Sequence, residues 1–170
     1  MKNKKVNGKQ KGASFELSIA KVFSEWYGCE NSFARSPGSG AWSNIHDSNK
    51  VPGDIVTPEK FPFVIECKKQ EVFELYGIFK EDARPLLDWW EQACRDATRT
   101  EKLPLLIIGR NRQPTLICMY ERDFVYFLTK KPNILAFFQL KNQPLVMLLL
   151  EDFLLGTNSL PNIIKEKEQR

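Results

Sequence analysis

The stretch Val51-Pro-Gly-Asp-Ile-Val-Thr-Pro-Glu-Lys-Phe-Pro-Phe-Val-Ile-Glu-Cys-Lys-Lys69 contains two short apolar segments joined by a turn. Each apolar segment carries an acid, Asp54 or Glu66, where a buried strand would favour an apolar residue. Side chains alternate along a strand, so Glu66 and Lys68 project from the same face. If the turn is centred near Lys60, the two antiparallel strands place Asp54 opposite Glu66.

Two carboxylates in these positions favour a bound cation. Residues that face each other on paired strands have Cβ atoms about 4.5–5.5 Å apart, and like charges at that distance destabilise a sheet. A divalent ion between Asp54 and Glu66 would remove the repulsion, and carboxylate oxygens suit Mg²⁺ or Mn²⁺. The alternative is a surface acid–lysine pair without function, since acid-X-Lys on a strand also occurs by chance.

The two segments resemble the signature of the PD-(D/E)XK nuclease superfamily, in which an acid ends one strand and acid-X-lysine lies on the next. Here the signature reads Pro52-Gly53-Asp54 and Glu66-Cys67-Lys68. A helix opening at 11–16, the segment 33–40 and a later helix with Gln92 complete an order similar to that of archaeal-type Holliday junction resolvases and related phage enzymes.

The resemblance covers residues 11–110 and implies both fold and chemistry. It implies an α/β fold with a restriction-endonuclease-like core, in which helices flank a central mixed sheet in the order α-β-β-β-α-β. It implies Asp54, Glu66 and the backbone carbonyl of Cys67 as metal ligands, with Glu16 beside the metal. Lys68 would orient or deprotonate water, or stabilise the phosphate in the transition state.

Further residues are candidates for catalysis or DNA binding. In resolvases a loop serine is implicated in catalysis, and the resemblance implies that Ser39 or Ser36 has this role. The alternative is that the two serines belong to a simple turn without a catalytic role. Arg35 suits a phosphate because its guanidinium can donate two parallel hydrogen bonds. Gln92 matches a glutamine of the family but is also an ordinary surface residue. The predicted DNA-binding set is Lys11, Arg35, Ser36, Gln92, Arg95 and Arg99.

Hydrophobic periodicity predicts the remaining elements. The segment 145–150 fits either a strand or a buried helix, and periodicity does not separate the two. Helices are expected at 12–27, 82–102 and 121–128, and strands at 31–36, 54–57, 61–69, 103–109 and 115–120.

Length and composition are typical of one soluble globular domain. The chain has 170 residues, of which 42% are hydrophobic and 27% charged. We expect a basic flexible arm at 1–11, a single nuclease domain at 12–155 and a charged tail at 156–170. The domain would consist of a core at about 12–120 and a divergent part at 121–155. The arm holds five lysines and no acid, and it either contacts nucleic acid or only aids solubility.

The cysteines and hydropathy indicate a cytoplasmic protein, and the resemblance implies a prokaryotic or phage-infected host cell. Cys29, Cys67, Cys94 and Cys118 lack CxxC spacing, and His46 is the single histidine, so a zinc site is not expected. No apolar signal segment begins the chain. Polar residues interrupt the apolar region 134–155, so its uninterrupted apolar segments are too short for a membrane-spanning helix.

The sequence therefore predicts a metal-dependent, structure-selective DNA endonuclease of the Holliday junction resolvase type, active in recombination and repair. We expect a four-way DNA junction as substrate and a homodimer, for which surplus apolar residues between Phe124 and Leu155 are the candidate interface. Two alternatives remain: a restriction or repair nuclease of the same superfamily, and a catalytically silent nucleic-acid-binding module of this fold.

Overall fold

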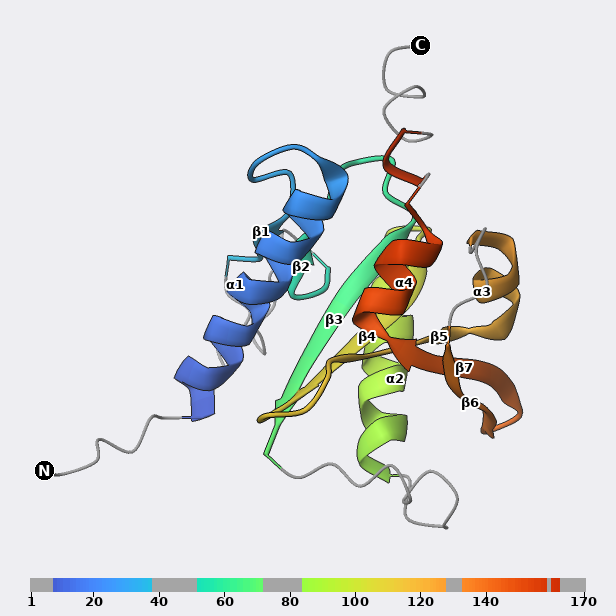
Figure 1. The fold of residues 1–170 in the computed structure, drawn as a ribbon. Coiled ribbons are helices and arrows are strands. Elements are labelled where there is room, and N and C mark those ends of the chain that lie inside the picture. Colours follow the sequence, from blue (N-terminus) through green and yellow to red (C-terminus); the bar gives the residue numbers. More distant parts are fainter. Residues whose placement is uncertain (1–7, 38–51, 72–83, 128–132, 159, 163–170) are drawn as a thin grey trace, which may run out of the picture.

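A seven-stranded sheet forms the centre of the protein (Figure 1). The computed structural model describes residues 8–37, 52–71, 84–127, 133–158 and 160–162. The elements are α1 (Gly8–Tyr27), β1 (Ala34–Arg35), β2 (Ile55–Val56), β3 (Phe63–Gln70), α2 (Arg84–Thr98), β4 (Leu103–Arg110), β5 (Leu116–Tyr120), α3 (Glu121–Phe127), β6 (Ile134–Leu140), β7 (Gln143–Leu149) and α4 (Leu150–Gly156).

The sheet is mixed, and its strand order is β1-β2-β3-β4-β5-β7-β6. Strands β3 and β4 are parallel neighbours, paired from Phe63 with Leu103 to Gln70 with Arg110, and the chain between them contains α2. The other neighbours are antiparallel. The predicted α/β class and the order α-β-β-β-α-β are thus confirmed.

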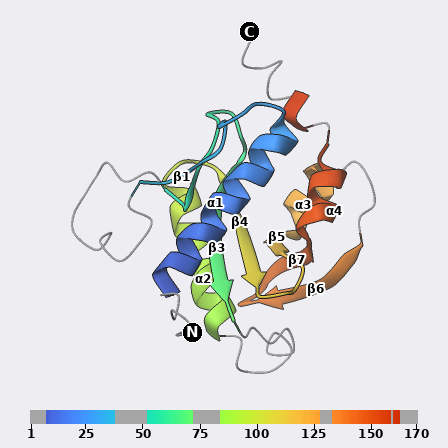
Figure 2. The ribbon, with the colours of Figure 1, turned by 60° about the vertical axis from the view of Figure 1, so that its left-hand side comes forward.

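Helices cover both faces of the sheet, as Figures 1 and 2 show from two sides. Helices α1, α3 and α4 pack on one face, where Phe23, Phe63 and Phe153 lie in a largely aromatic core. Helix α2 covers the other face, and its Leu86 and Trp90 pack in a second cluster. Burial of both faces explains why β4 is a continuous apolar run rather than an alternating one.

Several boundaries differ from the predicted ones. Helix α1 begins at Gly8, so the last residues of the expected arm are helical, and β1 has only two residues. The ambiguous segment is strand β7, and α4 follows it from Leu150. Strand β6 was not predicted. It lies at the edge of the sheet, and its side chains are alternately half-buried and exposed. Its sequence is a short apolar run, and such a run fits a strand or a helix equally well.

The structure also bears on the cysteines and the membrane. All four cysteines are free thiols, and Cys67 and Cys118 are buried. Within the described ranges, no helix is both long enough and apolar enough to span a bilayer.

Candidate active site

Asp54 and Glu66 lie side by side where β2 meets β3. The two strands pair at Ile55 and Ile65, and continuing this antiparallel register by one residue places Asp54 opposite Glu66, as predicted. Asp54 is fixed by its own backbone, since its N–H donates to the Ile65 carbonyl at 2.9 Å. Its carboxylate accepts a second bond, from the Cys67 N–H to Oδ2, at 2.9 Å. The Asp54 side chain is therefore bound directly to the backbone of β3.

Gly53 allows the chain to enter this arrangement. Its φ of +79° lies in the left-handed region, which residues with a Cβ rarely adopt. A Cβ at this position would lie 2.7 Å from the Ile65 carbonyl oxygen and 2.7 Å from Cγ1 of Val64. The close approach of the turn to β3 requires glycine, and this approach brings Asp54 against β3.

Glu66 is the most deeply buried acid of the site, with 1% of its surface exposed. Burial, followed by the nearby charge of Asp54, raises its pKa to about 8. One oxygen, Oε1, accepts a hydrogen bond from Lys68 Nζ at 2.6 Å. The other, Oε2, is buried and has no hydrogen-bond partner within the described ranges. A buried acceptor without a partner costs free energy, so this oxygen is suited to a ligand.

Lys68 lies between two acceptors. Besides Glu66, its ammonium group donates to Oε1 of Gln92 at 2.8 Å. Glu66 and Lys68 pair in register with Leu106 and Ile108, which belong to the core cluster beneath α2. The two side chains therefore share the α2 face of the sheet, and Gln92 reaches them from that helix.

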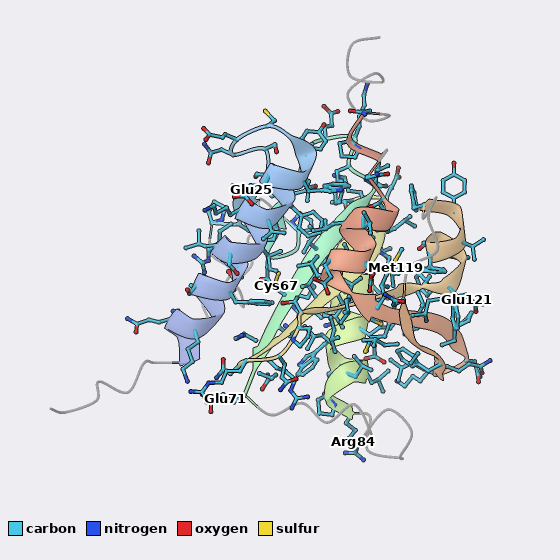
Figure 3. All side chains as sticks on the ribbon, in the orientation of Figure 1. Glu25, Cys67, Glu71, Arg84, Met119 and Glu121 are labelled. Carbon is cyan, nitrogen blue, oxygen red and sulfur yellow. The ribbon has the colours of Figure 1, made fainter. Side chains whose placement is uncertain are left out.

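The surroundings of Asp54 disfavour negative charge. Burial raises its pKa, the Cys67 N–H opposes that shift, and the charge of Glu16 raises the pKa further. Burial together with the same acids raises the pKa of the Cys67 thiol well above its usual value. Figure 3 shows Cys67 on the central part of β3. The thiol is a neutral core group, so only its backbone carbonyl is a candidate ligand.

Glu16 extends from α1 toward this acidic pair and is 9% exposed. Its Oε2 accepts a hydrogen bond from Nε of Arg35 at 2.6 Å. The resemblance implied Glu16 beside the metal, but the sequence held no signal of its pairing with Arg35, because the two residues are 19 positions apart. A predicted phosphate ligand is thus the partner of a predicted metal-site acid.

The arrangement fits a cation at Asp54 and Glu66. Two adjacent carboxylates with raised pKa values and a buried, unpartnered Glu66 oxygen are suited to a positive ligand. In the part of the chain that the structure describes, no three acidic, cysteine or histidine side chains converge as a metal cluster. Glu16, held by Arg35, is therefore near the pair without forming a three-acid cluster with it.

The other predicted residues lie at varying distances from the site. Ser36 is buried, its N–H donates to the Asp54 carbonyl at 2.9 Å, and its hydroxyl has no partner within the described ranges. Ser39 lies outside the described residues. Arg95 is exposed on α2, and Arg99, directly after the end of α2, pairs with Asp96 of that helix at 3.5 Å.

Lys11 is tied to the end of β3 by an ion pair with Glu71. Figure 3 shows Glu71 at that end, beside the first turns of α1. Lys69, directly after the acid-X-Lys motif, lies over the ring of Phe15 at 5.2 Å. These contacts dock the beginning of α1 next to β3.

The chain is similar to known proteins in sequence and structure. It is 27% identical over 124 residues to "Protein D14" of Escherichia phage T5, covering 69% of this chain and 74% of that protein. A search of solved structures matched Hjc of Archaeoglobus fulgidus, described as a Holliday junction resolvase from an archaeal hyperthermophile. That match has 15% identity and a TM-score of 0.39, and it covers 90% of this chain and 99% of the other.

A match to a protein family covers the PD-(D/E)XK signature of this chain. The sequence model of a family described as "Phage putative PDDEXK endonuclease" matches residues 7–158, a range that includes every described residue of the site. This match confirms the predicted relation to the PD-(D/E)XK nucleases. The chain belongs to this family of phage PDDEXK endonucleases.

Proposed function

We propose that this nuclease is a divalent-cation-dependent endodeoxyribonuclease that cuts branched DNA of the four-way junction type. The observation that carries the proposal is the pairing of Asp54 with buried Glu66, whose free oxygen Oε2 has no partner within the described ranges and whose other oxygen contacts Lys68. A folded domain retains such a cluster at a cost in stability, and clusters of this kind are typical of functional sites.

Mg²⁺ or Mn²⁺ would be held by Asp54, Glu66 and the Cys67 carbonyl. A cation bound there would supply Lewis-acid stabilisation for phosphodiester hydrolysis. The residues fit this role because they are hard oxygen donors on two adjacent strands and because a bound cation would relieve the repulsion between the two carboxylates. Glu16 would be a further ligand for the cation, and it is close enough to influence the pKa of Asp54.

Lys68 would be the hydrogen-bond donor to the substrate in this site. Glu66 and Gln92 hold its ammonium group at 2.6 and 2.8 Å, so the direction of the side chain is set before substrate arrives. In this position the lysine either binds a phosphate oxygen as negative charge develops or orients the attacking water. Preorganised donors of this kind need no rearrangement during the reaction.

A homodimer would place two such sites on opposed strands of one junction. Support comes from β6, an edge strand of seven residues without a charged side chain. Phe137 on this strand is 52% exposed, and Val125 and Tyr126 of the neighbouring α3 are 70% and 80% exposed. Uncharged exposed edges invite pairing with another chain, and a two-fold interface uses one patch twice.

Cleavage of a synthetic four-way junction and of a matched linear duplex tests the proposal. Each DNA is incubated with Mg²⁺, with Ca²⁺ and with EDTA, and with wild-type, Asp54→Asn and Glu66→Gln proteins. Asp88→Asn, a charge-removing change at an exposed position of α2, is the matched control. We expect symmetric nicks on the junction in Mg²⁺, no cutting in EDTA, and loss of cutting in both site variants.

The remaining outcomes separate the alternatives. Equal cutting of junction and linear duplex would indicate a restriction or repair nuclease and leave the chemistry standing. Undiminished cutting in excess EDTA would refute the cation dependence. Binding of DNA without cutting under every condition would indicate a silent nucleic-acid-binding module.

A further inference from the structure

The ion pair of Arg35 with Glu16 lies beside the acidic pair. Nε of Arg35 is 2.6 Å from Oε2 of Glu16, and the two side chains are 30% and 11% exposed. Arg35 pairs in register with Ile55, which directly follows Asp54, and the charge of Glu16 contributes to the raised pKa values of Asp54 and of the Cys67 thiol. The guanidinium therefore compensates the charge of a third carboxyl group near a site that already contains two.

Glu16 is held by the bond from Arg35 to its Oε2. With this partner, Glu16 does not join Asp54 and Glu66 in a three-acid cluster within the described ranges.

Arg35 is in turn connected to Asp54 through the backbone. The next residue, Ser36, donates its N–H to the Asp54 carbonyl at 2.9 Å. A guanidinium presents the same planar set of donors to a carboxylate and to a phosphate. A DNA phosphate that reaches the site from the exposed side of Arg35 therefore competes with Glu16 for the same donors.

We propose that Arg35 is the counter-ion of Glu16 in the cation-free protein and exchanges this carboxylate for a DNA phosphate, which releases Glu16 to the cation site. The inference rests on the proposed function, because it needs a cation at Asp54 and Glu66 and a phosphate donor in DNA. Arg35 is then a positioning residue, which controls the availability of Glu16 and does not itself react.

The first test measures binding of Mn²⁺ alone by calorimetry, without DNA. Arg35→Gln should tighten Mn²⁺ binding about fivefold, the effect of releasing one partly exposed ion pair. In a Glu16→Gln background the same change should have less than a twofold effect, since no carboxylate remains to be released. Arg35→Lys keeps the charge and should stay within twofold of wild type.

Lys21→Gln is the matched control for net charge. Lys21 lies on the same helix, is 78% exposed and pairs with Glu25, so its removal should leave Mn²⁺ affinity unchanged. Cooperative unfolding followed by circular dichroism confirms that each variant is folded. The second test measures DNA binding in EDTA, where Glu16→Gln should tighten binding by freeing Arg35 and Arg35→Gln should weaken it.

The outcomes distinguish this inference from the proposed function. Equal tightening of Mn²⁺ binding by Arg35→Gln in both backgrounds, or none in either, would overturn the exchange and leave Arg35 a structural partner. The proposed function would still stand if Glu66→Gln abolished Mn²⁺ binding. Failure of the folded wild-type protein to bind Mn²⁺ would overturn both.

Discussion

Replacement of Gly53 by alanine should destabilise the protein by about 1–5 kcal/mol. A φ of +79° costs a residue with a Cβ about 1–2 kcal/mol. The new Cβ would also lie 2.7 Å from the Ile65 carbonyl oxygen and from Cγ1 of Val64, and overpacking of this kind costs about 1–3 kcal/mol. The smaller entropy of the unfolded alanine chain offsets about 0.4–1 kcal/mol of the sum.

The same change should impair the site more than the fold. Gly53 directly precedes Asp54, whose carboxylate bonds the Cys67 N–H at 2.9 Å. Relief of the clash moves the turn away from β3 and with it the Asp54 oxygens. We therefore expect a folded protein, since domains of this size have about 5–15 kcal/mol of stability, but one with greatly reduced DNA cleavage.

Urea unfolding in EDTA measures the stability change, and Gly8→Ala is the matched control. A Cβ on Gly8 would meet no atom within 4 Å, and alanine in a helix is favoured over glycine by about 0.5–1 kcal/mol. The control should therefore be neutral or stabilised. The reasoning is refuted if Gly53→Ala unfolds within about 0.5 kcal/mol of wild type, a range typical of surface changes.

Four other outcomes are expected. Because burial raises the pKa of Glu66 from 4.5 to about 8, the stability that Glu66 contributes in EDTA should be fully present below pH 4.5 and be lost as the pH rises toward 8. The free energy of unfolding of wild type minus that of Glu66→Gln, measured in urea, should therefore fall over this range, and a difference that stays constant or rises would contradict the prediction. Gln92→Ala removes one of two acceptors of Lys68 and should lower kcat about tenfold or more with little change in KM; equal loss of DNA affinity in Ca²⁺ would instead indicate a DNA contact. Deletion of residues 1–7, with three lysines, should weaken DNA binding and flatten its salt dependence by counterion release, and an unchanged slope would show that the arm does not touch DNA. Phe137→Asp should convert a dimer to a monomer by light scattering, and a wild-type mass of 19.7 kDa would refute the dimer.

The sequence by itself determined the parts of the protein that depend on neighbours in the chain. Asp54 and Glu66 belong to one hairpin, so alternation and a turn near Lys60 sufficed to predict their pairing, and the register of Ile55 with Ile65 confirms it. The predicted order α-β-β-β-α-β is likewise confirmed, with α2 between the parallel strands β3 and β4. In these cases the signal is a local period, and the geometry of strands and helices converts it directly into position.

The tertiary structure alone decided the contacts between distant segments. Gln92 reaches Lys68 across 24 positions, and Arg35 reaches Glu16 across 19. Neither contact has a sequence signal, because a polar residue on a helix has the same local pattern whether it faces solvent or a buried partner. Edge strand β6 and the length of α1 also depend on which faces the packed elements leave exposed. The burial that raises the pKa of Glu66 exists only after β3, α2 and the β2 turn close around it, because desolvation is a property of the packed domain and not of the motif.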